Sequence, residues 1–291
     1  MNRRELLKSS VAGALGLWAS PRALAQRLTD KIEVLDAYGA NLVALNLGYG
    51  LLLVDSGPDH SADETVRFVP NVRILFNTHY HFDQTGFNEY YAVHDAKIIA
   101  HERTRQWMAP HWIPAEERYA NARPKLALPT ETFLTTGSLK VADEQIDYGY
   151  LELAHTSGDI YVLFKNANVL AVGDVASPLR DPALDWFTGA WIGGRVDAMD
   201  LLLKLANEQT KIVPAYGPVM TRADFKAERD MMEEVRARLF TKVREADSPK
   251  DMLEEGVLNG LARTWKDPYK FLYDAAKGLW AHHDKLDPNV V

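Results

Sequence analysis

Apolar and polar positions alternate over short distances in the stretch after residue 30, and this pattern predicts β-strands. Three strands are expected over residues 31–35, 41–47 and 51–55, with Gly48-Tyr49-Gly50 as a hairpin turn. The following run Val72–Phe76 is rich in β-branched and aromatic residues, which predicts a buried strand. It stops at a polar segment that ends in Gly86, so a loop is expected there.

Helical and strand patterns alternate from residue 87 onward, which indicates layers of helices and sheets. Helices are expected over residues 62–69, 87–93, 102–108, 198–205 and 223–246. Strands are expected over residues 97–100, 139–142, 150–154, 160–164, 169–172 and 211–213. Residues 107–129 are rich in Pro, Trp and charge and predict an insertion, either a pocket wall or ordinary surface. Further helices after residue 248 are expected to pack on the core or to mediate a homodimer.

The first 25 residues predict a targeting segment. Arg3-Arg4 precede an apolar stretch, Val11–Ala19, and Ala23-Leu24-Ala25 is a small-residue cleavage site. The segment resembles a twin-arginine signal and departs from the usual pattern at Asn2 and Leu6. Its apolar stretch has about half of the roughly 20 residues that a bilayer requires. The mature protein is therefore expected in the periplasm, with no stable membrane anchor after signal removal.

Composition narrows the classes of function. With 291 residues and 47% hydrophobic content, the chain can bury a sizeable core. The net charge of −7, without a cluster of Lys and Arg, argues against nucleic acid as a partner and leaves a small-molecule substrate. Because the chain contains no cysteine, any metal must be held by nitrogen and oxygen.

The polar segment after Val72–Phe76 contains the strongest chemical signal. His79, His81 and Asp83 alternate there, and alternate residues of an extended loop point to one side. Imidazole and carboxylate are the ligands that a borderline divalent ion such as zinc prefers. The alternative is a solvated loop with coincidental histidines. The remaining histidines lack ligand spacing and are interpreted as structural: His60, His94, His101, His111, His282 and His283.

The order of several motifs carries a family resemblance. His79-x-His81-x-Asp83 lies between Val54-Asp55-Ser56-Gly57 and His155-Thr156-Ser157-Gly158-Asp159, and Gly173-Asp174 and Pro214-Ala215-Tyr216-Gly217 follow. Together they resemble the metallo-β-lactamase fold superfamily over roughly residues 30–225. The resemblance implies an α+β fold, a four-layer αββα sandwich over residues 26–245, with a helical C-terminal extension over residues 246–291.

Fully equipped members of that superfamily hold two metal ions. The resemblance implies that His79, His81 and His155 bind the first, an open three-histidine arrangement that produces hydroxide from water at neutral pH. Asp83 and Asp174 match ligands of the second ion. Two histidines expected there are replaced by Gln84 and Tyr216, whose oxygens are weaker zinc ligands. We therefore expect one zinc ion per chain rather than two, with iron or manganese as alternatives.

The resemblance also suggests roles for the remaining groups. Asp83 would orient or deprotonate the bound water, Asp174 would be a ligand or an outer partner, and Tyr216 would donate a hydrogen bond to substrate. The expected activity is hydrolysis of an ester, thioester, lactone or lactam-like bond. The alternatives are a non-catalytic metal-binding or partner-binding protein and an iron-dependent redox enzyme.

Two further features have open interpretations. Asp55 either braces the metal loop or is a plain turn residue. The loop over residues 177–194 carries Trp186, Phe187 and Trp191. These rings either grip an apolar substrate or anchor the loop through core contacts.

Overall fold

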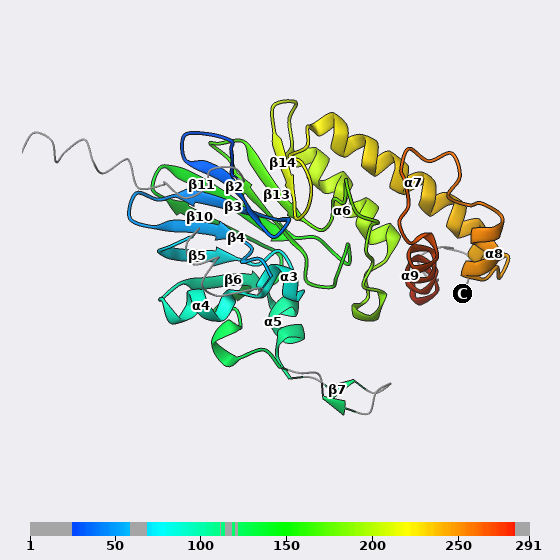
Figure 1. Ribbon diagram of the computed structural model, residues 1–291, viewed down its shortest axis with the longest axis horizontal. Coiled ribbons are helices and arrows are strands. Elements are labelled where there is room, and N and C mark those ends of the chain that lie inside the picture. The colour runs from blue at the N-terminus through cyan, green and yellow to red at the C-terminus, as the bar shows by residue number, and fades with distance from the viewer. Residues whose placement is uncertain (1–24, 59–68, 111, 114–117, 120–121, 283–291) are drawn as a thin grey trace, which may run out of the picture.

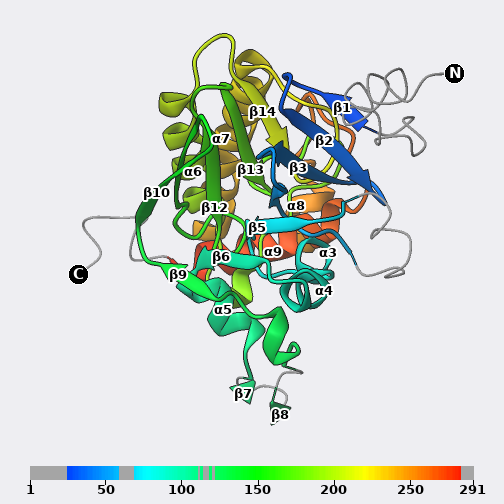
Figure 2. The same cartoon turned by 90° about the vertical axis from the view of Figure 1, so that its left-hand side faces the viewer.

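Two β-sheets form the centre of the protein in a computed structural model, which describes residues 25–58, 69–110, 112–113, 118–119 and 122–282 (Figure 1). The first sheet contains, in spatial order, β1 (Ala25–Arg27), β2 (Ile32–Ala37), β3 (Ala40–Asn46), β4 (Leu51–Val54), β5 (Val72–Phe76), β6 (Lys97–His101) and β9 (Glu131–Phe133). The second contains β10 (Thr136–Val141), β11 (Glu144–Tyr150), β12 (Ile160–Phe164), β13 (Val169–Gly173) and β14 (Lys211–Pro214). The short strands β7 (Trp112–Ile113) and β8 (Arg118–Tyr119) pair with each other and project from the body (Figure 2).

Helices cover the outer faces of both sheets. Beside the first sheet lie α3 (Phe82–Thr85), α4 (Asn88–Val93), α5 (Glu102–Met108) and the short 3-10 helix η3 (Lys125–Ala127). The second sheet is covered by α6 (Ile192–Leu205), α7 (Arg222–Arg244) and α9 (Pro268–Ala281), with η4 (Trp186–Thr188) and α8 (Pro249–Glu254) at their ends. The predicted αββα sandwich is confirmed. The helix expected over residues 62–69 falls almost wholly outside the described residues.

Three apolar layers hold the sandwich together. Between the sheets, Val43 and Leu45 pack in the same cluster as Val162 and Phe164. The outer face of the first sheet is sealed by residues of α4, including Tyr91. A larger cluster joins β13 and β14 to α6, α7 and α9. Because both faces of the second sheet are covered, all five residues of β13 are buried, which explains its continuous apolar sequence.

The strand expected over residues 150–154 is wrong. The strand there is β11, which begins at Glu144 and ends at Tyr150. A tight turn, in which Ala142 has a φ of 51°, pairs β11 with β10. Within β11, Ile146 and Tyr148 turn their apolar side chains into the core, while polar residues alternate with them. That alternation contains too few apolar residues to stand out in the sequence. Residues 151–159 consequently form a loop.

The helix expected to begin at residue 198 begins earlier, at Ile192. Gly193 and Gly194 occupy its first turn, and glycines of this kind resemble a loop in the sequence. A side chain at Gly194 would collide with the carbonyl oxygen of Leu153, so the glycine permits the helix to pack tightly against the loop over residues 151–159. Among the described residues, no helix combines the length and apolar character needed to cross a membrane.

Candidate metal centre

The metal loop, residues 77–86, begins at the carboxyl end of β5. Asp55, at the end of β4, accepts hydrogen bonds from the backbone N–H of Thr78 at 2.7 Å and from its hydroxyl at 2.8 Å. Asp55 therefore braces the loop. Burial raises the pKa of its carboxyl to about 8. The loop is extended only as far as His81, because α3 begins at Phe82 and places Asp83 in a helical turn. The expectation of one extended loop is therefore wrong for residues 82–85, which are helical.

His155 comes from the loop between β11 and β12, and the expectation that it follows a strand end directly is wrong. The side chain of Asp159 closes this loop, accepting from the backbone N–H groups of His155 at 2.7 Å and Thr156 at 2.8 Å. Its other oxygen accepts from the Thr156 hydroxyl at 2.6 Å. Leu153 has a φ of 53°, a strained conformation held by the packing of α6. Asp174, by contrast, directly follows β13 as expected.

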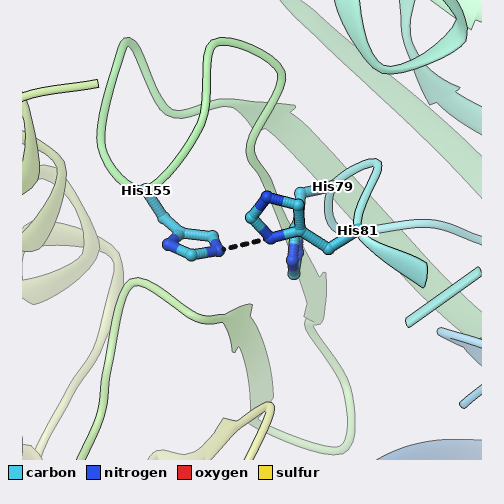
Figure 3. A group of neighbouring side chains, drawn as sticks. All are labelled: His79, His81 and His155. Atoms are coloured by element: carbon cyan, nitrogen blue, oxygen red, sulfur yellow. Dashed lines mark hydrogen bonds between the residues drawn. The ribbon is translucent and has the colours of Figure 1, made fainter. Parts of the chain in front are cut away.

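Three imidazoles converge although they come from two distant parts of the chain (Figure 3). One ring nitrogen from each of His79, His81 and His155 lies within 4.8 Å of the others, and His155 Nε2 lies 3.0 Å from His81 Nδ1. His79 Nε2 is buried and has no hydrogen-bond partner among the described residues. Asp174 Oδ2 lies 3.6 Å from both His79 Nε2 and His155 Nε2. Buried nitrogens that face one another, one of them unsatisfied, fit a bound cation.

The second nitrogen of each ring contacts a protein oxygen. His79 Nδ1 lies 3.1 Å from the hydroxyl of Thr78, which donates its own proton to Asp55. His155 Nδ1 donates to the carbonyl oxygen of Ala183 at 2.9 Å. His81 Nε2 lies 3.3 Å from Asp185 Oδ2, and a carboxylate can only accept. These contacts leave one nitrogen of each ring directed to the centre, where a bound cation would take the place of the proton shared by His155 Nε2 and His81 Nδ1.

The electrostatics agree with this geometry. Burial, together with the neighbouring imidazoles, lowers the pKa of His79 well below its usual value. Burial and the charge of His81 lower the pKa of His155 to about 3. Burial also lowers the pKa of His81, but Asp185 outweighs it and the net shift is upward. A metal binds neutral imidazole, which burial favours at His79 and His155 and which the charge of a bound cation would favour at His81, so the residues present fit a divalent ion.

The residues expected around a second ion are arranged differently. The Tyr216 hydroxyl donates to Asp83 Oδ2 at 2.6 Å, and the guanidinium carbon of Arg180 lies 3.1 Å from the centre of the Tyr216 ring. Burial and the hydrogen bond to Asp83 raise the pKa of Tyr216, which keeps it a phenol. The amide of Gln84 is fully buried, and neither its oxygen nor its nitrogen has a partner in the described part of the chain.

Asp174 sits between these two groups of residues. Burial, followed by the charge of Asp83, raises the pKa of its carboxyl to about 7, while His81, Arg195 and Arg180 act in the opposite direction. A cation beside it would favour the ionised form. The carboxyl is therefore positioned either to bind an ion held by the histidines or to hydrogen-bond to such an ion's other ligands.

Asp185 is a candidate site residue that no sequence pattern indicated. Its Oδ2 accepts from the Tyr80 hydroxyl at 2.5 Å as well as from His81. Burial raises the pKa of Asp185, but these two donors lower it more, and the net shift is downward. Asp185 lies 104 residues after His81, so no local sequence motif connects the two residues. The only signal in the sequence is its place in the aromatic loop before Trp186.

The aromatic residues of that loop have separate roles. Trp191 is buried and stacks on His282 at a centroid distance of 4.8 Å, so it anchors the loop. Trp186 contacts Tyr273 of α9. Phe187 is 48% exposed and contacts Trp107 instead.

The other histidines in the described residues have structural contacts. His101 begins α5 by accepting from the backbone N–H of Arg103, and its Nε2 contacts the carbonyl oxygen of Leu134 at 3.0 Å. His94 Nδ1 contacts the carbonyl oxygen of Tyr90, and His282 Nε2 contacts that of Gly189. The structural interpretation of these three is confirmed. His60, His111 and His283 lie outside the described residues.

A sandwich of two sheets with three converging imidazoles is an arrangement that can hold a metal ion, and the sequence matches a family with this fold. Residues 37–217 match the metallo-β-lactamase superfamily, and the chain belongs to this superfamily.

Solved structures resemble this fold at low sequence identity. A metallo-β-lactamase from Pontibacter korlensis aligns with a TM-score of 0.58 and 17% identity, covering 72% of this chain and 98% of its own. The DIM-1 metallo-β-lactamase aligns with a TM-score of 0.57 and 16% identity, covering 73% and 98%. For the metallo-β-lactamase IND-7 the values are 0.56 and 17%, covering 74% and 100%. These likenesses concern the fold.

Proposed function

We propose that this protein is a metal-dependent hydrolase in which His79, His81 and His155 hold one divalent ion, with zinc as the ion. The observation that supports this most directly is the convergence of three imidazole nitrogens, two of them from buried rings, with the other nitrogen of each ring against a protein oxygen. Three neutral imidazoles with an open fourth position are typical of catalytic zinc rather than structural zinc.

A zinc ion at this position would polarise a carbonyl oxygen and lower the pKa of a water molecule to about 7. The protein groups around it would control protons and orientation. Asp83 would orient the attacking water or accept its proton, and the hydrogen bond from Tyr216 would keep that carboxylate in place. The phenol has one proton, so a hydrogen bond from Tyr216 to oxygen charge developing on the substrate would replace the one to Asp83. Asp174 would be a ligand or an outer partner.

One ion is proposed rather than two because the second group of residues is already engaged. Asp83 Oδ2 is bound by the Tyr216 hydroxyl, and Gln84 offers a neutral amide where relatives supply an imidazole. A phenol with a raised pKa is a poor metal ligand at neutral pH. Attack of a water molecule on a carbonyl would need only the ion held by His79, His81 and His155.

The proposed substrate is a small molecule with an ester, thioester, lactone or lactam-like bond. The named structural relatives are metallo-β-lactamases, which makes the lactam one candidate bond among these. A fold supports many chemistries, so the scissile bond must be found by assay.

Metal analysis and a hydrolase panel test the proposal. The purified full chain is expected to contain about one zinc per chain and to hydrolyse a member of the panel, with loss of turnover on chelation and recovery on adding zinc. His155→Ala should lose both the metal and the turnover, while Tyr49→Ala, in the β3–β4 turn at the far end of the strands, should lose neither. A folded chain that takes up no zinc and turns over no substrate would overturn the hydrolase proposal. Iron with oxygen uptake would favour redox chemistry instead.

We also propose that the protein is exported to the periplasm. The support is the twin-arginine-like segment over residues 1–25 and its small-residue cleavage site. N-terminal sequencing of protein from the periplasmic fraction should begin at Gln26. Retention of the intact chain in the cytoplasm would contradict this.

A further inference from the structure

A row of aromatic rings leads away from the metal centre to the surface. The ring centre of Tyr80 lies 4.5 Å from that of His81, and Trp107 stacks on Tyr80 at 5.9 Å with an interplanar angle of 29°. Phe187 follows at 5.9 Å from Trp107. The three rings come from the metal loop, α5 and η4 respectively. We call Tyr80, Trp107 and Phe187 the aromatic row.

Hydrogen bonds hold the first two rings in place. The Tyr80 hydroxyl donates to Asp185 at 2.5 Å, and Trp107 Nε1 donates to the hydroxyl of Ser157 at 2.7 Å. Both acceptors belong to segments that shape the metal centre, since Asp185 contacts His81 and Ser157 follows His155 by two positions. The row is therefore oriented by the same loops that orient the ligands. Rings held this way present a surface without losing rotamer freedom on binding.

The outer end of the row is open to solvent. Phe187 is 48% exposed, whereas Trp191, four residues later in the same segment, is buried and anchors the loop. Trp107 is half-buried. A single exposed phenylalanine is ordinary on a protein surface. Here, however, the exposed ring continues a stack that ends at a metal-binding imidazole, and small-molecule sites are typically lined by such aromatic groups.

We propose that the aromatic row binds a planar, apolar group that the substrate carries next to its scissile carbonyl. An aromatic ring is the group that matches these faces, because rings at such spacings pack in stacked and edge-to-face arrangements. The preferred substrates are then arylalkyl esters or thioesters rather than short aliphatic ones. This inference rests on the proposed function, because it places the scissile bond at the His79–His81–His155 centre.

A binding measurement on the zinc-loaded full chain tests the row directly. The probes are 3-phenylpropanoate and butanoate, two carboxylates that present the same metal-binding group and differ in the ring. Calorimetry should show 3-phenylpropanoate binding about tenfold more tightly, as expected for burying one ring. Phe187→Ala should remove most of this preference, and Phe187→Tyr, which keeps the ring, should retain it. Because Phe187 is exposed, these variants should fold normally.

Tyr49→Ala provides the matched control, since Tyr49 is also an exposed aromatic residue and lies in the β3–β4 turn, remote from the carboxyl end of β5. It should leave the preference unchanged. Steady-state kinetics with the methyl esters of the two acids add a second readout. Phe187→Ala should raise KM for methyl 3-phenylpropanoate and leave kcat largely unchanged.

The two proposals fail in different ways. Metal-dependent hydrolysis with equal binding of both carboxylates, or an unchanged preference in Phe187→Ala, would overturn the aromatic row and leave the hydrolase intact. Selective binding of 3-phenylpropanoate that depends on Phe187, without any turnover, would support the row and overturn the hydrolase.

Discussion

The candidate metal centre has a three-histidine side and an Asp83–Tyr216 side, and the metal loop contributes residues to both. The polar groups of the two sides have different kinds of partner. On the three-histidine side, His79, His81 and His155 each have one nitrogen against a protein oxygen and the other directed to a shared point. On the other side, Asp83 is bound by Tyr216, and the Gln84 amide lies buried without a partner among the described residues.

The difference separates three donors that can share one cation from a carboxylate that already has a protein partner. Imidazoles that face one another can be satisfied together by a cation, and His79 Nε2 has no hydrogen-bond partner among the described residues. A carboxylate that already accepts a strong hydrogen bond has a protein partner in place of a metal. The position where relatives hold a second ion is thus occupied by a phenol–carboxylate pair, over which Arg180 adds a permanent positive charge.

Placing histidines at positions 84 and 216 would make the Asp83 side resemble the three-histidine side. This change should have the largest effect on zinc binding. The double variant Gln84→His with Tyr216→His frees Asp83 and supplies two nitrogen ligands, so zinc content should rise from about one to about two per chain. Metal analysis after dialysis measures this. Gln84→Asn with Tyr216→Phe is the matched control, because it changes the same positions without adding imidazole. Unchanged stoichiometry in the histidine variant would mean that the loop geometry, not the ligand chemistry, excludes the second ion.

Removing the carboxylate behind His81 should have an intermediate effect. Asp185→Asn replaces the charged acceptor of His81 Nε2–H with a neutral amide, and zinc affinity should fall by about 10- to 100-fold, as is usual for partners of metal-binding histidines. Competition with a fluorescent chelator measures the affinity, and the visible spectrum of the cobalt form reports the ligand geometry.

Tyr80→Phe is the companion variant, because it removes the other donor to Asp185 Oδ2 while it keeps the ring. It should weaken zinc binding less than Asp185→Asn does. Equal zinc affinities for the wild type and Asp185→Asn would show that the negative charge of Asp185 does not contribute to zinc binding.

The smallest effect is expected from a substitution at Gly173, where the second sheet contacts the metal loop, and it concerns the stability of the fold. Gly173 has a φ of 57°, and a Cβ there would lie 2.8 Å from Thr78, the residue held by Asp55. Gly173→Ala should lower the free energy of unfolding by about 1–2 kcal/mol, from left-handed strain and the close contact. Denaturant unfolding of the metal-free protein checks this. Gly39→Ala, also at positive φ but with open space around it, separates backbone strain from the collision.

Much of the fold could be predicted because local pattern and tertiary position agree. Val72–Phe76 and Ile160–Phe164 are strands over the predicted residues, since β-branched and aromatic residues dominate both segments. Glu102–Met108 is likewise a helix as predicted. The errors fall where a neighbour overrides the pattern. Gly193-Gly194 resembled a loop, yet their small size permits α6 to pack against Leu153.

For the centre, the sequence by itself determined which donors are available: three histidines in recognisable motifs, no cysteine, and Gln84 and Tyr216 where imidazoles were expected. Only the tertiary structure decided which groups meet. It places His155 beside the metal loop through a strained turn, engages Asp83 with Tyr216, and puts Asp185 behind His81. The physical reason is the distance along the sequence between the residues that interact. Ligand identity and strand pattern are properties of neighbouring residues, whereas contacts across a hundred residues depend on how two sheets and their loops pack.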